Sequence, residues 1–157
     1  MSSLLKIDDM SVRFATPRGD LKAVNNVSIE LLKGESLGVV GESGSGKTVL
    51  SRATMGLLPS TATRTGTITY QGQDITALPK DEVRELWGTG MAMIFQDPMT
   101  ALNPVRRVGS QLTESLTVRL GMNKKDAKEK AIELLKRVRI PDPEAMLRKF
   151  PYQLSGG

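Results

Sequence analysis

The residues best suited to chemistry lie in one short loop. Positions 41–48 read Gly-Glu-Ser-Gly-Ser-Gly-Lys-Thr, which fits the pattern G-x-x-x-x-G-K-[ST] of loops that hold nucleotide phosphates. Glycine lets the backbone turn tightly, so that successive N–H groups point at an anion. The Lys47 ammonium would bind the β- and γ-phosphates, and the Thr48 hydroxyl would bind Mg²⁺. We therefore predict a nucleotide site formed by Gly41, Ser43, Gly44, Ser45, Gly46, Lys47 and Thr48.

A phosphate-binding loop of this type connects a buried strand to a helix, and the segments on either side of this loop fit that arrangement. The apolar run 36–40 predicts a strand buried on both faces that ends at the loop, and residues 48–58 predict a helix that begins there. Before them, alternating apolar residues predict two half-buried strands, at 5–14 and 21–32, in an antiparallel arrangement. A Gly- and Ser-rich turn that matched by accident would not be expected in this setting, so the context supports the nucleotide site.

Beyond the loop the pattern changes from strands to helices. Residues 66–70 and 91–95 predict two more strands, with a short helix at 81–87 between them. Apolar residues then recur every three or four positions, which predicts amphipathic helices, one of them capped by Asn123. The residues expected to face the core of this helical part are Val105, Val108, Leu112, Leu116, Ala127, Ala131, Leu134, Leu135 and Val138.

These patterns predict an α/β fold in two parts, a nucleotide-binding core in residues 1–96 and a helical subdomain in residues 97–157. The net charge of +5 is dispersed, because basic residues alternate with acids, and only 4% of residues are aromatic, so no nucleic-acid partner is expected. No apolar run approaches the ~20 residues of a membrane span, and no secretory signal is visible. The lack of cysteine excludes disulfides and thiolate metal sites, and the lack of histidine removes the commonest general base.

Three further features accompany the loop in a set order. Phe14 precedes it, Gln96 follows the second apolar run and comes directly before Asp-Pro, and residues 154–157 read Leu-Ser-Gly-Gly. In this order the features resemble the ATP-binding subunits of ABC transporters, which carry an adenine-stacking aromatic residue, the phosphate loop, a glutamine loop and an LSGG signature. The sequence of residues 95–104 is similar to that found in the oligopeptide and dipeptide importer branch of this family.

The resemblance implies a role for each of these residues. Phe14 would stack on the adenine of ATP, although it would equally suit an inward-facing strand position. Gln96 would bind Mg²⁺ or orient a water molecule, and would share the catalytic work with Lys47. The signature would contact the γ-phosphate of an ATP held by a second ABC ATPase subunit, through Ser155, Gly156 and Gly157.

The resemblance also implies where such a protein works. The segment from Met99 to Pro104, with the helices after it, would contact transmembrane permease subunits. The subunit would lie peripherally at the cytoplasmic face of the cell membrane. MgATP hydrolysis between two subunits would drive uptake of peptides or a related solute, and the solute itself stays open because nickel and peptide importers share this motif wording.

Members of this family also carry an apolar strand that ends in Asp-Glu and a switch histidine, and neither can be assigned in this sequence. We therefore expect a fragment with weak nucleotide binding and negligible hydrolysis, because the missing acid would hold Mg²⁺ and position the attacking water. The strand before the loop would also be left with an unpaired edge.

Two other readings remain open: a truncated, non-catalytic subunit that gives only its signature to a full-length partner, and a soluble ABC ATPase that acts on nucleic acid. A P-loop kinase or GTPase would not explain Gln96 together with residues 154–157.

Overall fold

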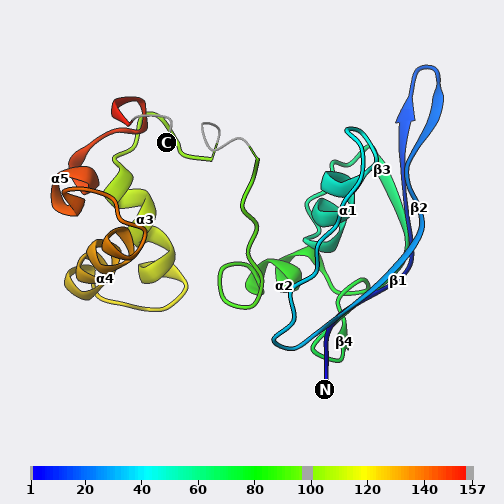
Figure 1. Ribbon diagram of the computed structural model, residues 1–157, viewed down its shortest axis with the longest axis horizontal. Helices are drawn as coiled ribbons and strands as arrows, with labels where there is room; N and C mark the ends of the chain where they lie inside the picture. Colours follow the sequence, from blue (N-terminus) through cyan, green and yellow to red (C-terminus); the bar gives the residue numbers. More distant parts are fainter. Residues whose placement is uncertain (1, 97–100, 155–157) are drawn as a thin grey trace. The chain divides into compact units, whose positions relative to one another are not determined.

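The computed structural model describes residues 2–96 and 101–154. The chain divides into two compact units, Met1–Trp87 and Gly88–Gly157 (Figure 1). Strands and two helices make up the first unit, and helices make up the second. Among the residues that the structure describes, none of the helices combines the length and apolar character that a membrane span requires.

An antiparallel sheet organises the first unit. Its strands are β1 (Ser3–Thr16), β2 (Gly19–Leu32), β3 (Ala62–Tyr70) and β4 (Gln73–Asp74), and they lie in the order β2-β1-β3-β4. The predicted pair of antiparallel strands before the loop is therefore confirmed, with β1 and β2 joined by a tight turn. At that turn the Thr16 hydroxyl donates a hydrogen bond of 2.6 Å to the carbonyl oxygen of Gly19.

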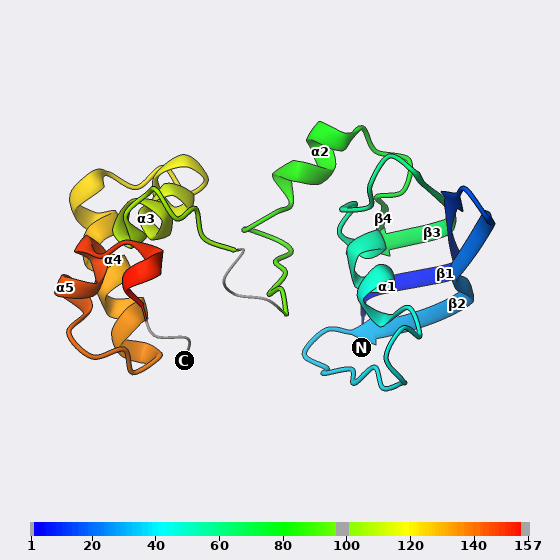
Figure 2. The same ribbon diagram turned by 90° about the horizontal axis from the view of Figure 1, so that it is seen from above.

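One face of this sheet carries helix α1 (Lys47–Thr54), as Figure 2 shows. The second helix of the unit, α2 (Lys80–Glu85), follows β4. Apolar side chains from the sheet and from α1 form the core, because burying them removes apolar surface from water. The buried apolar residues of this unit are Ile7, Met10, Val12, Val24, Leu50, Ala53, Met55, Ile68 and Ile75.

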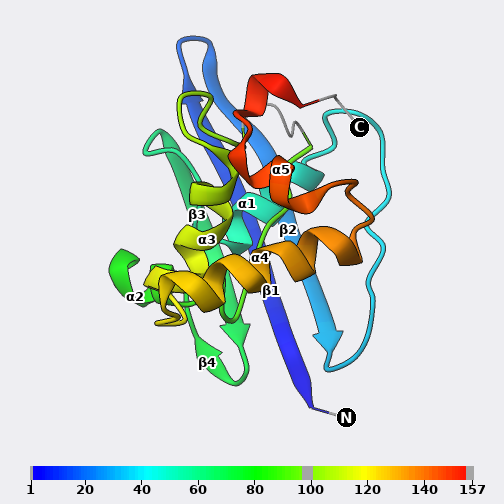
Figure 3. The same ribbon diagram turned by 90° about the vertical axis from the view of Figure 1, so that its left-hand side faces the viewer.

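In the described part of the second unit, residues 88–96 and 101–154, the chain forms α3 (Val108–Val118), α4 (Lys124–Arg137), α5 (Pro143–Arg148) and a short 3₁₀ turn, Pro151–Gln153. The three helices pack against one another (Figure 3). Gly109 permits a close approach of α3 to α5, since a Cβ atom there would lie 2.6 Å from the carbonyl oxygen of Leu147. The predicted cap of α4 is confirmed, because the Asn123 side chain accepts a hydrogen bond from the Asp126 N–H.

Several residues expected in the helical core are instead exposed. Val108, Ala127 and Ala131 are buried as predicted, but Leu134 is 41% exposed and Val138 is 68% exposed. Val105, before the start of α3, and Leu112 are exposed as well. The prediction was wrong at these positions because α4 is buried through its two alanines, a stripe too narrow to include the last apolar residues of the pattern.

Two apolar runs predicted as strands, 36–40 as a strand buried on both faces and 91–95 as a further strand, do not form strands in the structure. Val40 is 96% exposed and Ile94 is 97% exposed. A strand buried on both faces needs hydrogen-bonded neighbours along its edges. Within the described residues neither run has such a ladder, so both stay in irregular backbone and the prediction of strands is corrected here.

Candidate nucleotide-binding site

The loop at 41–48 leads from irregular backbone into α1, and its glycines have conformations that other residues avoid. Gly44 and Gly46 have φ of 82° and 91°, in the left-handed region where a Cβ atom is strained. Gly46 also lies directly against β2, where a Cβ atom would overlap the carbonyl oxygen of Ala23. Glycine is therefore favoured at both positions by the backbone angle, and at Gly46 also by the close approach to the sheet.

The Lys47 ammonium is held by the loop itself. Its Nζ donates hydrogen bonds to the carbonyl oxygens of Gly41 at 2.7 Å and Glu42 at 2.6 Å, and to the Ser45 hydroxyl at 3.2 Å. These three acceptors match the three donors of an ammonium group. The cation is thus positioned at the mouth of the loop, and a phosphate that bound there would replace some of these neutral acceptors with charged ones.

The first turn of α1 adds to this positive character. Its N-cap is Gly46, whose side chain cannot cap the helix, and the first turn contains no acidic residue. The free N–H groups of a helix start attract anions. Thr48 is exposed in this turn, and its hydroxyl has no partner among the described residues. Backbone N–H groups, one ammonium and one free hydroxyl therefore share the loop, which is a donor set suited to a phosphate with a bound metal ion.

The far end of α1 is held by a half-buried arginine that the sequence patterns did not single out. Arg64 of β3 donates to the carbonyl oxygen of Ala53 at 3.2 Å and to that of Thr76 at 3.3 Å. Burial lowers the pKa of this guanidinium, while the nearby Asp74 opposes the shift. Cations stabilise the carboxyl end of a helix, so Arg64 helps to keep α1 and its loop against the sheet.

Phe14 lies in β1, where it pairs with Leu21 of β2. It is partly exposed and shares a strand face with the buried Val12, two residues earlier. Leu21 is two residues from Ala23, the residue against which Gly46 packs. The register thus places Phe14 near the loop side of the sheet, and its role toward adenine stays a prediction.

The other predicted site residues are not brought to the loop by the described geometry. Gln96 is exposed and belongs to the second unit, at the end of the run 91–95. Ser155, Gly156 and Gly157 lie outside the described residues, as do Met99 and Thr100 at the start of the predicted permease contact.

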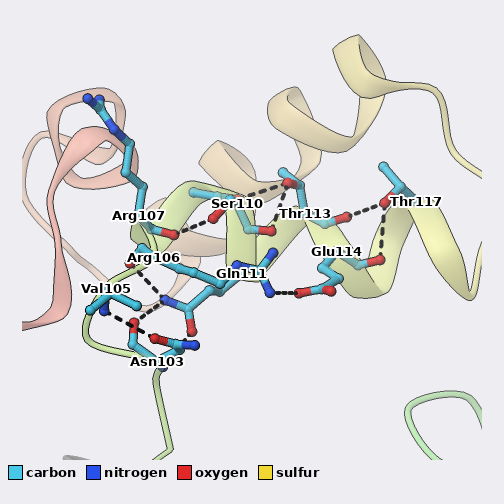
Figure 4. A network of polar contacts seen from close by, with 10 residues as sticks. Asn103, Val105, Arg106, Arg107, Ser110, Gln111, Thr113, Glu114 and Thr117 are labelled. Carbon is cyan, nitrogen blue, oxygen red and sulfur yellow. Dashed lines mark hydrogen bonds and ion pairs between the residues drawn. The ribbon is translucent and has the colours of Figure 1, made fainter.

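The remainder of that predicted contact is anchored by a residue that the sequence patterns missed. Gln111 of α3 accepts a hydrogen bond of 2.8 Å from the Asn103 N–H and donates to the carbonyl oxygens of Asn103 and Arg106, each at 3.0 Å (Figure 4). The Asn103 side chain in turn accepts from the Val105 N–H at 3.1 Å. From the sequence, a glutamine in an amphipathic helix is expected to face solvent, so the role of Gln111 could not be predicted.

The segment that leads to the signature is also ordered by local contacts. The Phe150 N–H donates to Gln153 Oε1 at 2.9 Å, and the Phe150 and Tyr152 rings stack with centroids 5.6 Å apart. The Arg107 guanidinium lies 5.6 Å from the centre of the Phe150 ring, within range of a cation–π contact. Residues 150–154 are therefore joined to the start of α3.

Comparison with known proteins shows which protein family the chain belongs to. Residues 24–157 match the family model described as ABC transporter. The chain therefore belongs to the ABC transporter family. Its fold is that of an ATP-binding cassette: a dimeric cassette solved in a post-hydrolysis state with ADP and Pi superimposes with a TM-score of 0.81 at 21% identity, over 97% of this chain and 63% of that one.

Within the family, the sequence is similar to ATP-binding proteins of peptide transporters, as the motifs predicted. It is 45% identical to the oligopeptide transport ATP-binding protein OppD of Salmonella typhimurium over 98% of this chain and 46% of that protein. It is 44% identical to the dipeptide transport ATP-binding protein DppD of Bacillus subtilis, over 100% of this chain and 48% of that one. The chain thus spans about half the length of these relatives.

Proposed function

We propose that this chain forms part of the ATP-binding subunit of an ABC importer for peptides or a related solute. The observation that carries the proposal is the Lys47 ammonium, held across the mouth of a glycine loop by the carbonyl oxygens of Gly41 and Glu42. Its similarity to OppD and DppD supports the solute class. In this proposal residues 1–96 bind the nucleotide, and residues 97–157 reach the partner subunits.

Each residue has a stated role in this proposal. Lys47 binds the β- and γ-phosphates, Thr48 and Gln96 bind Mg²⁺, and Phe14 stacks on adenine. Gln96 also orients the attacking water, which makes it, with Lys47, the catalytic pair. Signature residues Ser155, Gly156 and Gly157 contact ATP on a second cassette subunit, and the segment from Met99 to Pro104 contacts the permease subunits at the cytoplasmic face of the membrane.

Titration of the 157-residue chain with MgATP in a calorimeter tests the nucleotide site. We expect weak, saturable binding that Lys47→Ala weakens by roughly tenfold or more, because one charge-assisted contact contributes about 1.5–3 kcal/mol. Lys125→Ala, an exposed lysine of α4 outside the loop, serves as the matched control and should leave binding unchanged. Equal affinity of the wild type and Lys47→Ala would refute the proposal.

We expect the same chain to show negligible ATP turnover, because it contains no assignable carboxylate after an apolar strand to hold Mg²⁺ and position water. Phosphate release measured in the calorimetry buffer checks this. Robust turnover that is abolished by Lys47→Ala would support the nucleotide site but would contradict the expectation that this chain hydrolyses ATP negligibly.

A further inference from the structure

The second unit carries a groove of about 500 Å³ lined by residues of α3, α4 and α5 and by the two arginines before α3. One face of α3, with Ser110, Thr113 and Thr117, forms one side of this groove (Figure 4). Leu147 of α5 and Gly109 of α3 lie where the two helices approach most closely, and α4 contributes its first turns. A cavity of this size is in the range of small-ligand sites.

The groove is strongly basic. Its lining holds five basic and two acidic side chains, a net charge of +3 out of the +5 of the whole chain. Only one pair is neutralised, because Arg106 forms an ion pair of 2.7 Å with Glu114. The ionisable residues of the lining are Arg106, Arg107, Glu114, Lys124, Lys128, Glu144 and Arg148.

Four of these cations form no ion pair with a described residue, and one of the four, Arg107, instead lies over the Phe150 ring. Lys124, Lys128 and Arg148 are exposed, and none forms an ion pair or hydrogen bond with a described residue. Lys124 and Lys128 are one helical turn apart on the same face of α4, which is unfavourable for like charges. Lys124 is also the first residue of α4, where a cation opposes the helix dipole. Local helix stability therefore does not explain why these cations are gathered here.

The hydroxyl groups of the groove are already engaged. Ser110 donates to the carbonyl oxygen of Arg107 at 2.8 Å, Thr113 to that of Gly109 at 2.9 Å, and Thr117 to that of Thr113 at 3.0 Å. Their protons thus satisfy the backbone of α3. Recognition of a ligand in this groove falls to the charged side chains.

We propose that this groove binds a small polyanion that carries at least two carboxylate or phosphate groups. The unpaired cations Lys124 and Lys128 belong to α4 and Arg148 to α5, so two or three anionic groups on one small molecule can each contact a different cation. Charge-assisted contacts of this kind are stronger than hydrogen bonds between neutral groups. The site is independent of the nucleotide proposal.

Binding here would act on the segment before the signature. The Val108 N–H, at the start of α3, donates to the carbonyl oxygen of Lys149 at 2.9 Å, and Arg107 stacks on Phe150. Arg107 and Arg148 both line the groove and flank this connection. A polyanion that drew these two arginines together would therefore restrain residues 149–154 and, through them, the start of the signature.

The test is calorimetric titration of the full chain carrying Lys47→Ala, which removes the phosphate-loop cation, with citrate and with tripolyphosphate as probes. Ionic strength is matched with sodium chloride. We expect saturable binding of at least one probe, weakened by roughly a factor of ten for each cation removed in the double variant Lys128→Gln/Arg148→Gln. Comparing the affinities for citrate and tripolyphosphate shows whether the groove prefers carboxylates or phosphates.

The matched control is Lys125→Gln/Lys136→Gln, which removes the same charge from α4 outside the groove, and it should bind as the parent does. Circular dichroism of each variant confirms that the helices are retained. Absence of saturable binding of both probes, equal weakening by both double variants, or saturation by hexaglutamate but by neither small anion would overturn the proposal.

Discussion

The loop conformation can be tested at two glycines that share one backbone angle but differ in their surroundings. Gly44 and Gly46 have φ of 82° and 91°. A Cβ atom at Gly44 would meet no atom within 4 Å, whereas one at Gly46 would overlap the carbonyl oxygen of Ala23. Gly44→Ala and Gly46→Ala therefore introduce the same angular strain, and only the second disturbs the contact with the sheet.

The expected magnitudes follow from this difference. Left-handed backbone costs an alanine about 1–2 kcal/mol, which is the whole effect expected for Gly44→Ala. Forcing an extra carbon into a packed contact typically costs about 1–3 kcal/mol more. We therefore expect Gly46→Ala to lower the free energy of unfolding by about 2–5 kcal/mol, and its cost to exceed that of Gly44→Ala by at least about 1 kcal/mol.

Urea unfolding followed by tryptophan fluorescence measures the loss of stability in the first unit, which contains the loop. Trp87 is the only tryptophan of the chain, and its indole N–H donates to the carbonyl oxygen of Met55, at the end of α1, at 3.1 Å. Its emission therefore reports whether α1 is docked. Equal losses in the two variants would refute the inferred contact between the loop and β2, and a loss in neither would refute the left-handed conformations as well.

Two further predictions concern local hydrogen bonds. The Asp74 carboxylate accepts from the Thr76 N–H at 2.7 Å, and this bond lowers the pKa of Asp74. Its stabilisation is present above the ordinary carboxyl pKa and is lost as pH falls through the lower folded value, so Asp74→Asn should reduce the urea midpoint at pH 7 and flatten its decline on acidification. Asn123→Ala should cost about 1 kcal/mol through the lost cap of α4, measured by thermal unfolding followed at 222 nm. An unchanged pH profile, or no loss in Asn123→Ala, would contradict the respective assignment.

Features encoded by neighbouring residues could be predicted from the sequence. The strand pair before the loop, the helix that starts at Lys47 and the cap at Asn123 each depend on alternation, a motif or a side chain three residues away. Each is present in the structure. The identity of the family also followed from motifs, because their order along the chain carries that information.

Features that depend on distant residues could not be predicted in this way. The run 36–40 has the composition of a buried strand, but composition does not supply the neighbours that would pair with it, and Val40 is left 96% exposed. The contact between Gly46 and Ala23 joins residues on separate elements, and nothing in the local pattern indicates it. Arg64 likewise reads as an ordinary strand residue until its hydrogen bond to α1 is seen.

The loop holds its shape although the run before it forms no strand, and its contacts explain why. The Ser45 N–H donates to the carbonyl oxygen of Glu42 at 3.2 Å, and the Leu50 N–H to that of Gly46 at 2.8 Å. With the bonds of Lys47 to the same loop, the packing of Gly46 on β2 and the hydrogen bond of Arg64 to the end of α1, these restraints come from the loop, α1 and the antiparallel sheet. The hydrogen-bond donors of the loop are therefore positioned by elements other than residues 36–40, so burying that run should stabilise the first unit more than it reshapes the loop.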